Sequence, residues 1–183
     1  DDLSVLMWQS SELNDGAVLE FDFVASGDTL KFSYVFASEE YNEHTCSPYN
    51  DAFGFFISGP GIVGDGTFSN NAINLATIPG SNIPVAINSV NKGDNESNTD
   101  INTTEFDCFT TVFKVEIPVI CGETYKIKMA IADAVDGKND SAVFIKSKSF
   151  ASETPLEVEY LVVNPIEGVA SEGCSRFDFK LSR

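Results

Sequence analysis

Acidic and amide side chains gather between two of the most aromatic segments of the chain. Glu39 and Glu40 end one Phe-rich segment, and Asn50 and Asp51 begin the next. Calcium takes about six to eight oxygen ligands from carboxylates, amides, backbone carbonyls and water. These residues could therefore form part of a calcium site. The alternative is a solvated loop, in which Asn50-Asp51 is only a turn signal.

A further acidic stretch, from Asp133 to Asp140, follows another strand candidate. In Tyr125–Ile131 every second residue is apolar, which predicts a strand with these side chains on its inward face. Asp133 is the next residue on that face and should lie at the rim of the core. Asp136 and Asp140 follow around a glycine turn, although the spacing lacks the alternating acids and distal Glu of an EF-hand. If the acidic loops meet, the sequence predicts a calcium site that draws on Glu39, Glu40, Asn50, Asp51, Asp133, Asp136 and Asp140.

The two adjacent glutamates are expected to play different roles. Successive side chains of a strand point to opposite faces of the sheet. Glu40 shares a face with Tyr34 and Phe36, whereas Glu39 lies on the other face, unless a bulge intervenes. Only one of the two should therefore point into a given site.

Signals for catalysis are weak. The single histidine, His44, lies in a polar segment without a nucleophile motif such as GxSxG. A glycosidase needs two facing acids, but Glu39 and Glu40 point apart and spacing fixes no second acid. We therefore expect a protein that is not an enzyme, and keep a carbohydrate-active enzyme as the less favoured alternative.

Aromatic residues near the acidic stretch suggest another alternative, a lectin-like carbohydrate-binding domain. Tyr41 and Tyr49, with Trp8, could present ring faces to a sugar, since such rings combine apolar faces with polar atoms. Trp8 fits a core position equally well. The predicted binding platform consists of Tyr41 and Tyr49.

The charge of the chain excludes some partners. It has 28 acidic and 11 basic residues, for a formal net charge of −17. This charge repels nucleic acid and anionic membrane surfaces. No Lys or Arg occurs from residue 32 to residue 91, so the acidic residues there lack a counter-charge that a cation could supply. The chain contains no apolar run long enough to span a bilayer and opens on Asp1-Asp2 rather than on a signal sequence.

Four cysteines without a CxxC pair favour disulfides in an oxidising compartment over a zinc site. Free buried thiols are the alternative. Four cysteines allow three pairings. Among these we favour Cys46 with Cys108 and Cys121 with Cys174.

Strand signals dominate the chain. Alternating segments such as Leu19–Phe23 and Tyr125–Ile131 predict half-buried strands, whereas Phe32–Ala37 and Phe53–Ile57 predict strands covered on both faces. A further strand is expected over Val85–Val90. Many short strands with Gly and Pro turns predict an all-β fold, an antiparallel β-sandwich of jelly-roll type. Other expected strands cover residues 111–119, 142–146, 156–160 and 177–181.

A composition shift after Phe150 marks a boundary. We expect a sandwich domain over residues 1–150, whose upstream strands are missing from this chain. Residues 151–183 hold two strand candidates, which are too few for an independent domain. They either complete the sandwich or begin a following module.

Several motifs together resemble the choice-of-anchor L domain. They are Phe32-Ser33-Tyr34-Val35-Phe36-Ala37-Ser38-Glu39-Glu40-Tyr41, Asn50-Asp51-Ala52-Phe53-Gly54-Phe55-Phe56-Ile57-Ser58-Gly59-Pro60-Gly61, Asn74–Gly80, Val85–Asn91, Tyr125–Asp133 and Asp140–Phe144. The resemblance covers most of residues 15 to 150. Where the family usually has a glycine, this chain has Cys108, which supports a disulfide to the Cys46 loop but leaves the usual pairing open.

The resemblance implies a large secreted protein of Bacteroidota, exported through the type IX system and held at the outer cell surface, with adhesins of gliding bacteria among the owners. It implies no catalytic residues. The acidic positions within the shared motifs support calcium binding. The expected partners are a surface glycan or protein and the neighbouring modules of the same chain, with no nucleic acid and no direct membrane insertion.

Overall fold

The computed structural model describes residues 2–6, 12–41, 44, 46–90 and 106–153, and the backbone of strands at 157–163 and 176–182. In chain order the elements are α1 (Asp2–Leu6), β1 (Leu13–Val24), β2 (Thr29–Ser38), β3 (Ala52–Ser58), η1 (Ser69–Asn71), β4 (Ile73–Asn74), β5 (Cys108–Phe109), β6 (Phe113–Pro118), β7 (Thr124–Ala134), β8 (Ser141–Ile145), β9 (Ala151–Glu153), β10 (Glu157–Val163) and β11 (Arg176–Ser182).

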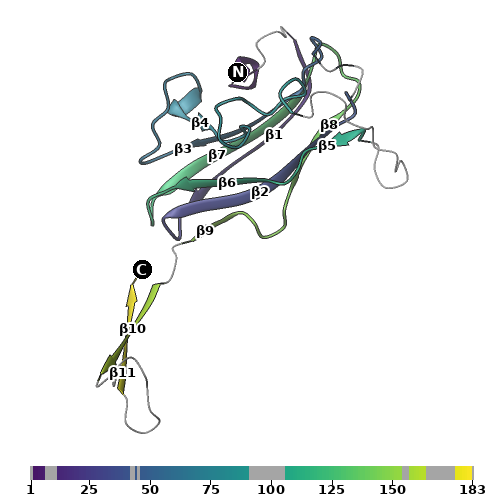
Figure 1. Cartoon of the computed structure of the whole chain (residues 1–183). Coiled ribbons are helices and arrows are strands. Elements are labelled where there is room, and N and C mark those ends of the chain that lie inside the picture. Colours follow the sequence, from purple (N-terminus) through teal and green to yellow (C-terminus); the bar gives the residue numbers. More distant parts are fainter. Residues whose placement is uncertain are drawn as a thin grey trace.

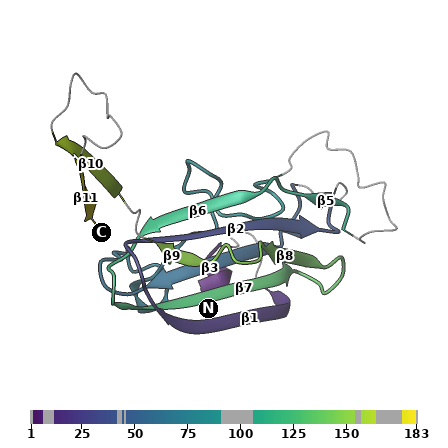
Figure 2. The same cartoon turned by 90° about the horizontal axis from the view of Figure 1, so that it is seen from below.

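Two antiparallel sheets pack face to face (Figures 1 and 2). In the first sheet the strand order is β1-β7-β3-β4. In the second sheet β2 is central, with β5 and β6 along one edge and β8 and β9 along the other. All these pairs are antiparallel, so the predicted all-β sandwich is confirmed.

Alternation along the strands builds the core between the sheets. In β2 the residues Leu30, Phe32, Tyr34 and Phe36 are buried, and the intervening ones are half-buried. The rings of Phe32 and Phe55 lie with centroids 4.1 Å apart, which joins β2 to β3 across the sandwich. Aromatic side chains bury large areas and lock both sheets into one arrangement. The core also includes Phe53, Ile57, Val85, Ile87, Tyr125, Ile127 and Met129.

A second, smaller cluster lies on the outer face of the first sheet. There α1 covers part of β3 and β7, and Leu3 and Leu6 pack with Phe56 and small alanines. As a result β3 is buried along its whole length, as the sequence predicted. For β2 the prediction of burial on both faces was wrong, because its outward residues are only half-buried.

The predicted strand over Val85–Val90 was also wrong. This segment makes a single isolated bridge, from Ala86 to Ala52, before it turns. The Ser89 hydroxyl hydrogen-bonds with the Ala86 N–H at 2.9 Å and thereby closes the turn. Local side-chain hydrogen bonds of this kind compete with sheet formation.

The strands β10 and β11 pair with each other and with no strand of the two larger sheets (Figure 1). In the part of the chain that is described, no helix has the length and apolar character required to cross a membrane.

Candidate functional site

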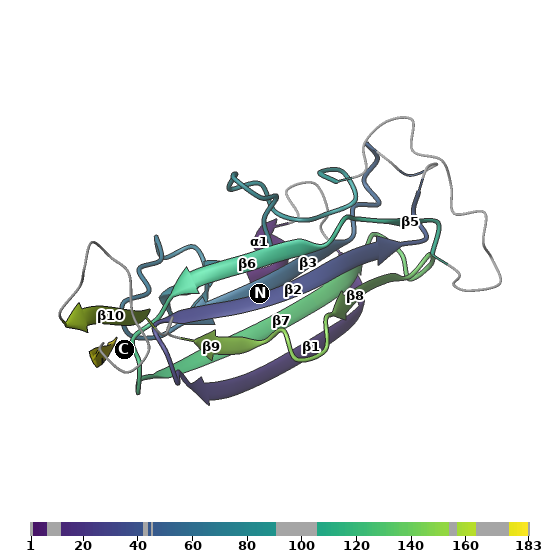
Figure 3. The same cartoon turned by 60° about the horizontal axis from the view of Figure 1, so that its bottom comes forward.

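The acidic stretches predicted from the sequence lie at one end of the sandwich. Here β2 and β7 end and β3 and β8 begin (Figure 3). The pair Ser38–Ser141 joins the end of β2 to the start of β8 within the second sheet, and the Ser141 hydroxyl reaches Asp51 at the start of β3 in the first sheet. We call the buried side chains of Glu40, Asp51 and Asp133 the acidic cluster.

Asp51 precedes β3 and is fully buried. The pairing of Ala52 with Ala132 places Asp51 next to Asp133 in the antiparallel register. One Asp51 oxygen accepts a hydrogen bond from the Ala134 N–H at 3.0 Å, and the other accepts one from the Ser141 hydroxyl at 2.7 Å. Asp51 therefore joins β7 to β8 and has both oxygens engaged.

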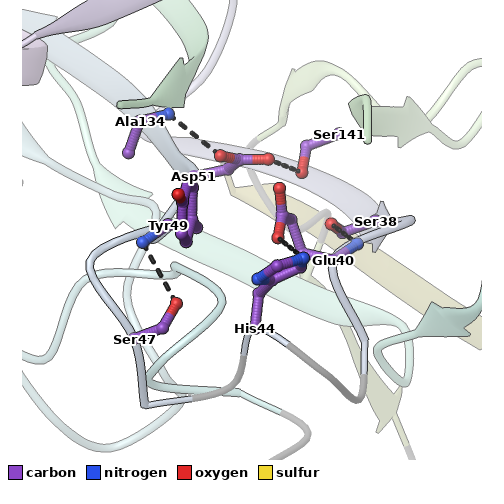
Figure 4. A network of polar contacts seen from close by, with 8 residues as sticks. All are labelled: Ser38, Glu40, His44, Ser47, Tyr49, Asp51, Ala134 and Ser141. Atoms are coloured by element: carbon purple, nitrogen blue, oxygen red, sulfur yellow. Dashed lines mark hydrogen bonds and ion pairs between the residues drawn. The ribbon is translucent and has the colours of Figure 1, made fainter. Parts of the chain in front are cut away.

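Glu40 contributes the carboxylate from the second sheet. It continues the inward face of β2 and is 1% exposed. Its Oε2 atom is buried and has no hydrogen-bond partner among the described residues. The Nε2 atom of His44 lies 3.9 Å from Oε2, which is close enough for an ion pair when the imidazole is protonated but beyond hydrogen-bonding distance (Figure 4). A buried carboxylate oxygen without a partner is costly, so it needs an explanation.

Asp133 lies near the end of β7 and is buried, 5% exposed. It continues the face that carries Tyr125, Ile127 and Met129 into the core, as the alternation predicted. Beyond it, Asp136 is half-buried and Asp140 is exposed in the β7–β8 loop. The Asp140 carbonyl accepts a hydrogen bond from the Glu39 N–H at 3.1 Å, which holds this loop against the end of β2.

Burial and neighbouring negative charges both raise pKa values in the acidic cluster. Burial, followed by the charges of Asp51 and Asp136, raises the pKa of Glu40 to about 8 despite a hydrogen bond from Asn139. Burial and the charges of Asp51 and Asp140 raise the pKa of Asp133 to about 7.

The pKa of Asp51 is raised too, mainly by burial, although its hydrogen bonds from Ser141 and Ala134 oppose the shift. Carboxylates this close cannot all ionise without a proton or a cation between them.

The two glutamates differ in burial. Glu39 is half-buried, whereas Glu40 is buried. The Glu39 backbone N–H holds the β7–β8 loop through its hydrogen bond to the Asp140 carbonyl. Glu39 therefore lies outside the acidic cluster.

The structure gives Asn50 a different partner from the one expected. Its side-chain oxygen accepts a hydrogen bond from the Asn88 N–H at 2.7 Å. This contact ties Asn50 to the turn at residues 86–89, so that oxygen already accepts one hydrogen bond. The amide was predicted as a ligand because spacing alone cannot show which way a side chain turns.

The predicted aromatic platform does not form as a surface. Tyr41 is 1% exposed, and its hydroxyl donates to the Val90 carbonyl at 3.1 Å. The prediction for Tyr41 was therefore wrong, because the ring packs into the core. Tyr49 is half-buried with its ring edge against His44, the centroids 4.9 Å apart. Trp8 lies outside the described residues.

The predicted disulfide between Cys46 and Cys108 is not formed in the structure. Cys46 and Cys121 are exposed and Cys108 is buried, and no two of these three described cysteines form a disulfide. Burial is the main reason that the pKa of Cys108 is raised. Cys174 lies outside the described residues, so the predicted bridge to Cys121 stays a prediction.

Three polar residues at the site were not predicted from the sequence. Ser38 and Ser141 face each other in the β2–β8 pair, and the Ser38 hydroxyl accepts a hydrogen bond from the Glu40 N–H at 2.9 Å. Asp15 lies in a bulge of β1, and its charge contributes to the raised pKa of Asp133. A side chain at Gly137 would collide with Asp15, since an added Cβ would lie 2.1 Å from its Oδ2. The Asp-Gly pairs in both segments are the only sequence signal for this contact.

In the side-chain positions described, no group of three or more His, Cys, Asp or Glu is arranged to hold a metal ion. The loop carboxylates Asp136 and Asp140 stand closer to solvent than the acidic cluster. Metal binding would therefore require these loop side chains to turn inward.

Comparison with known proteins gives one match. A family model described as "Choice-of-anchor L domain" matches residues 1–151. The chain matches no curated protein and no solved structure.

Proposed function

The chain belongs to the choice-of-anchor L domain family, a non-enzymatic family of surface modules, and on this premise we propose that it is a calcium-stabilised module of a secreted adhesin. Family membership itself places the protein outside the cell or at its surface. The adhesive role, the outer surface of a gliding member of Bacteroidota and export through the type IX system are parts of the proposal.

One observation carries the calcium part of the proposal: the Oε2 atom of Glu40 is buried inside the acidic cluster and accepts no hydrogen bond from the described residues. Buried carboxylates are normally paired or coordinate metals. The cluster supplies only oxygen ligands, which suits a hard cation such as calcium better than zinc or copper. The donor chemistry therefore fits calcium.

In this proposal Glu40, Asp51 and Asp133 hold the ion between the two sheets. Asp136 and Asp140 turn inward from the β7–β8 loop to complete the shell. Calcium would supply positive charge that offsets carboxylate repulsion. The protein's part is to tie the ends of β2, β3, β7 and β8 to one point, which stabilises the folded module.

The alternative of a carbohydrate-active enzyme fits the geometry less well. Glycosidase acids face each other across an open cleft that admits substrate and water. In this structure Glu40, Asp51 and Asp133 are at most 5% exposed, so they are closed off from a substrate. Buried acids favour a binding or structural role.

Thermal unfolding of calcium-stripped and calcium-loaded protein tests the proposal. At calcium about a hundredfold above Kd, linkage contributes about 2.7 kcal/mol, which corresponds to a rise in melting temperature of about 5–10 °C. Glu40→Gln should abolish most of this rise, because the amide cannot supply a second anionic oxygen.

Glu39→Gln is the matched control, since it makes the same chemical change on the neighbouring residue outside the acidic cluster. It should keep most of the calcium response. Equal losses in both variants, or melting temperatures that calcium and chelator leave unchanged, would contradict the proposal.

A further inference from the structure

The outer face of the first sheet, on the side of β3 and η1, carries a polar groove that the acidic cluster does not use. Two adjoining hollows of about 510 and 220 Å³ share Ser58, Asn70 and Lys126 in their linings. We call them together the outer groove. It lies at the opposite end of β3 from Asp51, because Asp51 precedes this strand and Ser58 is its last residue.

Strand register explains why polar groups gather there. Lys126 of β7 stands between Asp22 of β1 and Ser58 of β3 in one row across the sheet. Lys128 stands between Glu20 and Phe56 in the next row. Residues directly opposite one another in an antiparallel sheet share a face. Residues of β1, β7 and β3 that share this face therefore form the polar bottom of the groove.

The walls of the groove are held in place by several contacts. The Asp2 carboxylate accepts a hydrogen bond from the Ser69 N–H at 2.7 Å and pairs with Lys128 Nζ at 3.0 Å. Burial opposes ionisation of Asp2, but its contacts with Ser69 and Lys128 outweigh it and lower its pKa. The Tyr125 hydroxyl donates to the Pro60 carbonyl at 2.7 Å and holds the start of the same loop.

The loop is also compact at the groove. Asn70 and Asn71 have positive φ angles of 55° and 54°, which asparagine tolerates. A side chain at Gly64 would collide with the chain beside it, since an added Cβ would lie 2.5 Å from the Asn71 carbonyl oxygen. A wall that is already ordered loses little entropy when a ligand binds.

The chemistry of the groove selects one class of ligand. Lys126 lies 3.0 Å from Glu20 and 3.7 Å from Asp22, and Lys128 is paired with Asp2. Both lysines are therefore already neutralised, and an anionic ligand would meet three carboxylates. Amide, hydroxyl and ammonium groups still offer donors and acceptors to a neutral ligand that has many hydroxyls.

We propose that the outer groove binds a neutral glycan. This inference rests on the proposed adhesin function and names the chemical class of its ligand. Ser58, Asn70, Asn71 and Lys126 hydrogen-bond the sugar hydroxyls, and Ile62 and Gly59 offer an apolar surface to the ring. Calcium takes no part in this contact.

Binding of the whole chain to an array of neutral and acidic oligosaccharides tests the inference, with and without chelator. We expect binding to neutral oligosaccharides only. The double variant Asn70→Gly and Lys126→Met should weaken it at least about tenfold, because it removes two sets of hydrogen-bonding groups. Glycine keeps the positive φ that Asn70 requires.

Lys114→Met on β6 is the matched control, an exposed lysine of the other sheet, and should bind like the parent chain. No binding to any oligosaccharide, binding to acidic ones alone, or equal binding by the double variant would overturn the inference. If glycan binding fails, the calcium response of the melting temperature is unaffected. The two measurements therefore distinguish a failure of this inference from a failure of the proposed function. An unchanged melting temperature of the double variant excludes unfolding as the cause of lost binding.

Discussion

Glu40, Asp51 and Asp133 show how one fold can bury three acids from different strands. Asp51 satisfies both oxygens with protein donors, Ala134 N–H and the Ser141 hydroxyl. Glu40 keeps one oxygen without a partner. A residue whose hydrogen bonds are complete stabilises the fold, whereas one with an unmet oxygen leaves a place for a cation or a proton.

This difference predicts an unusual dependence of stability on pH. The pKa of Glu40 is raised from 4.5 to about 8 and that of Asp133 from 3.8 to about 7. The folded state therefore holds protons that the unfolded chain has released, and its free energy of unfolding falls as pH rises through this window. For calcium-stripped protein we expect a melting temperature several degrees higher at pH 5 than at pH 8.

Glu40→Gln should reduce this dependence, because the amide does not ionise. Calcium-loaded protein should lose less stability between the same two pH values, since the cation offsets the carboxylate charge. Asp2 does not interfere, because its contacts with Ser69 and Lys128 lower its pKa, away from this pH window. A calcium-stripped melting temperature that rises from pH 5 to pH 8 would contradict the assignment.

At the scale of elements, the β7–β8 loop combines strain with acidic residues. Val135, directly after β7, has a φ of 77°, and Asn139 has a φ of 59°. Positive φ is common for asparagine but a genuine outlier for a β-branched residue such as valine. The strain lies between Asp133, which belongs to the acidic cluster, and Asp136, which lies in the loop.

Replacement of Val135 by asparagine should relieve the strain, because asparagine tolerates the left-handed region. We expect a gain of about 1 kcal/mol, or about 2–4 °C in melting temperature, measured by thermal unfolding. Val112→Asn is the matched control at another exposed valine, one without a positive φ. A lower melting temperature for Val135→Asn than for the control would show that valine fits this conformation.

At the scale of the whole molecule, the chain divides into a sandwich and a separate pair of strands. No strand of the sandwich pairs with β10 or β11. A two-stranded hairpin alone is at best marginally stable in water. We therefore expect the sandwich to fold without β10 and β11.

A chain cut after residue 153 tests this division. Its melting temperature should lie within about 3 °C of that of the full chain, since β10 and β11 add no strand pairing to either sheet. The peptide 154–183 should show no cooperative unfolding when measured by circular dichroism. Loss of the cooperative transition in the shortened chain would mean that the terminal strands complete the sandwich.

Much of the fold followed from the sequence because hydrophobic alternation is a local property. The periods in β1, β2 and β7 predicted these strands and the inward face of β2. Burial of Asp133 followed from the same alternation. The acidic stretches alone were enough to suggest that carboxylates from distant segments meet.

Only the tertiary structure decided which of those side chains face one another. Asn50 turned to Asn88 and Tyr41 entered the core, because partners far away in the sequence offered each a hydrogen bond. The short turn at residues 86–89 replaced a strand for the same reason, a competing side-chain bond. The outer groove has no sequence motif at all, since strand register across three separate strands creates it.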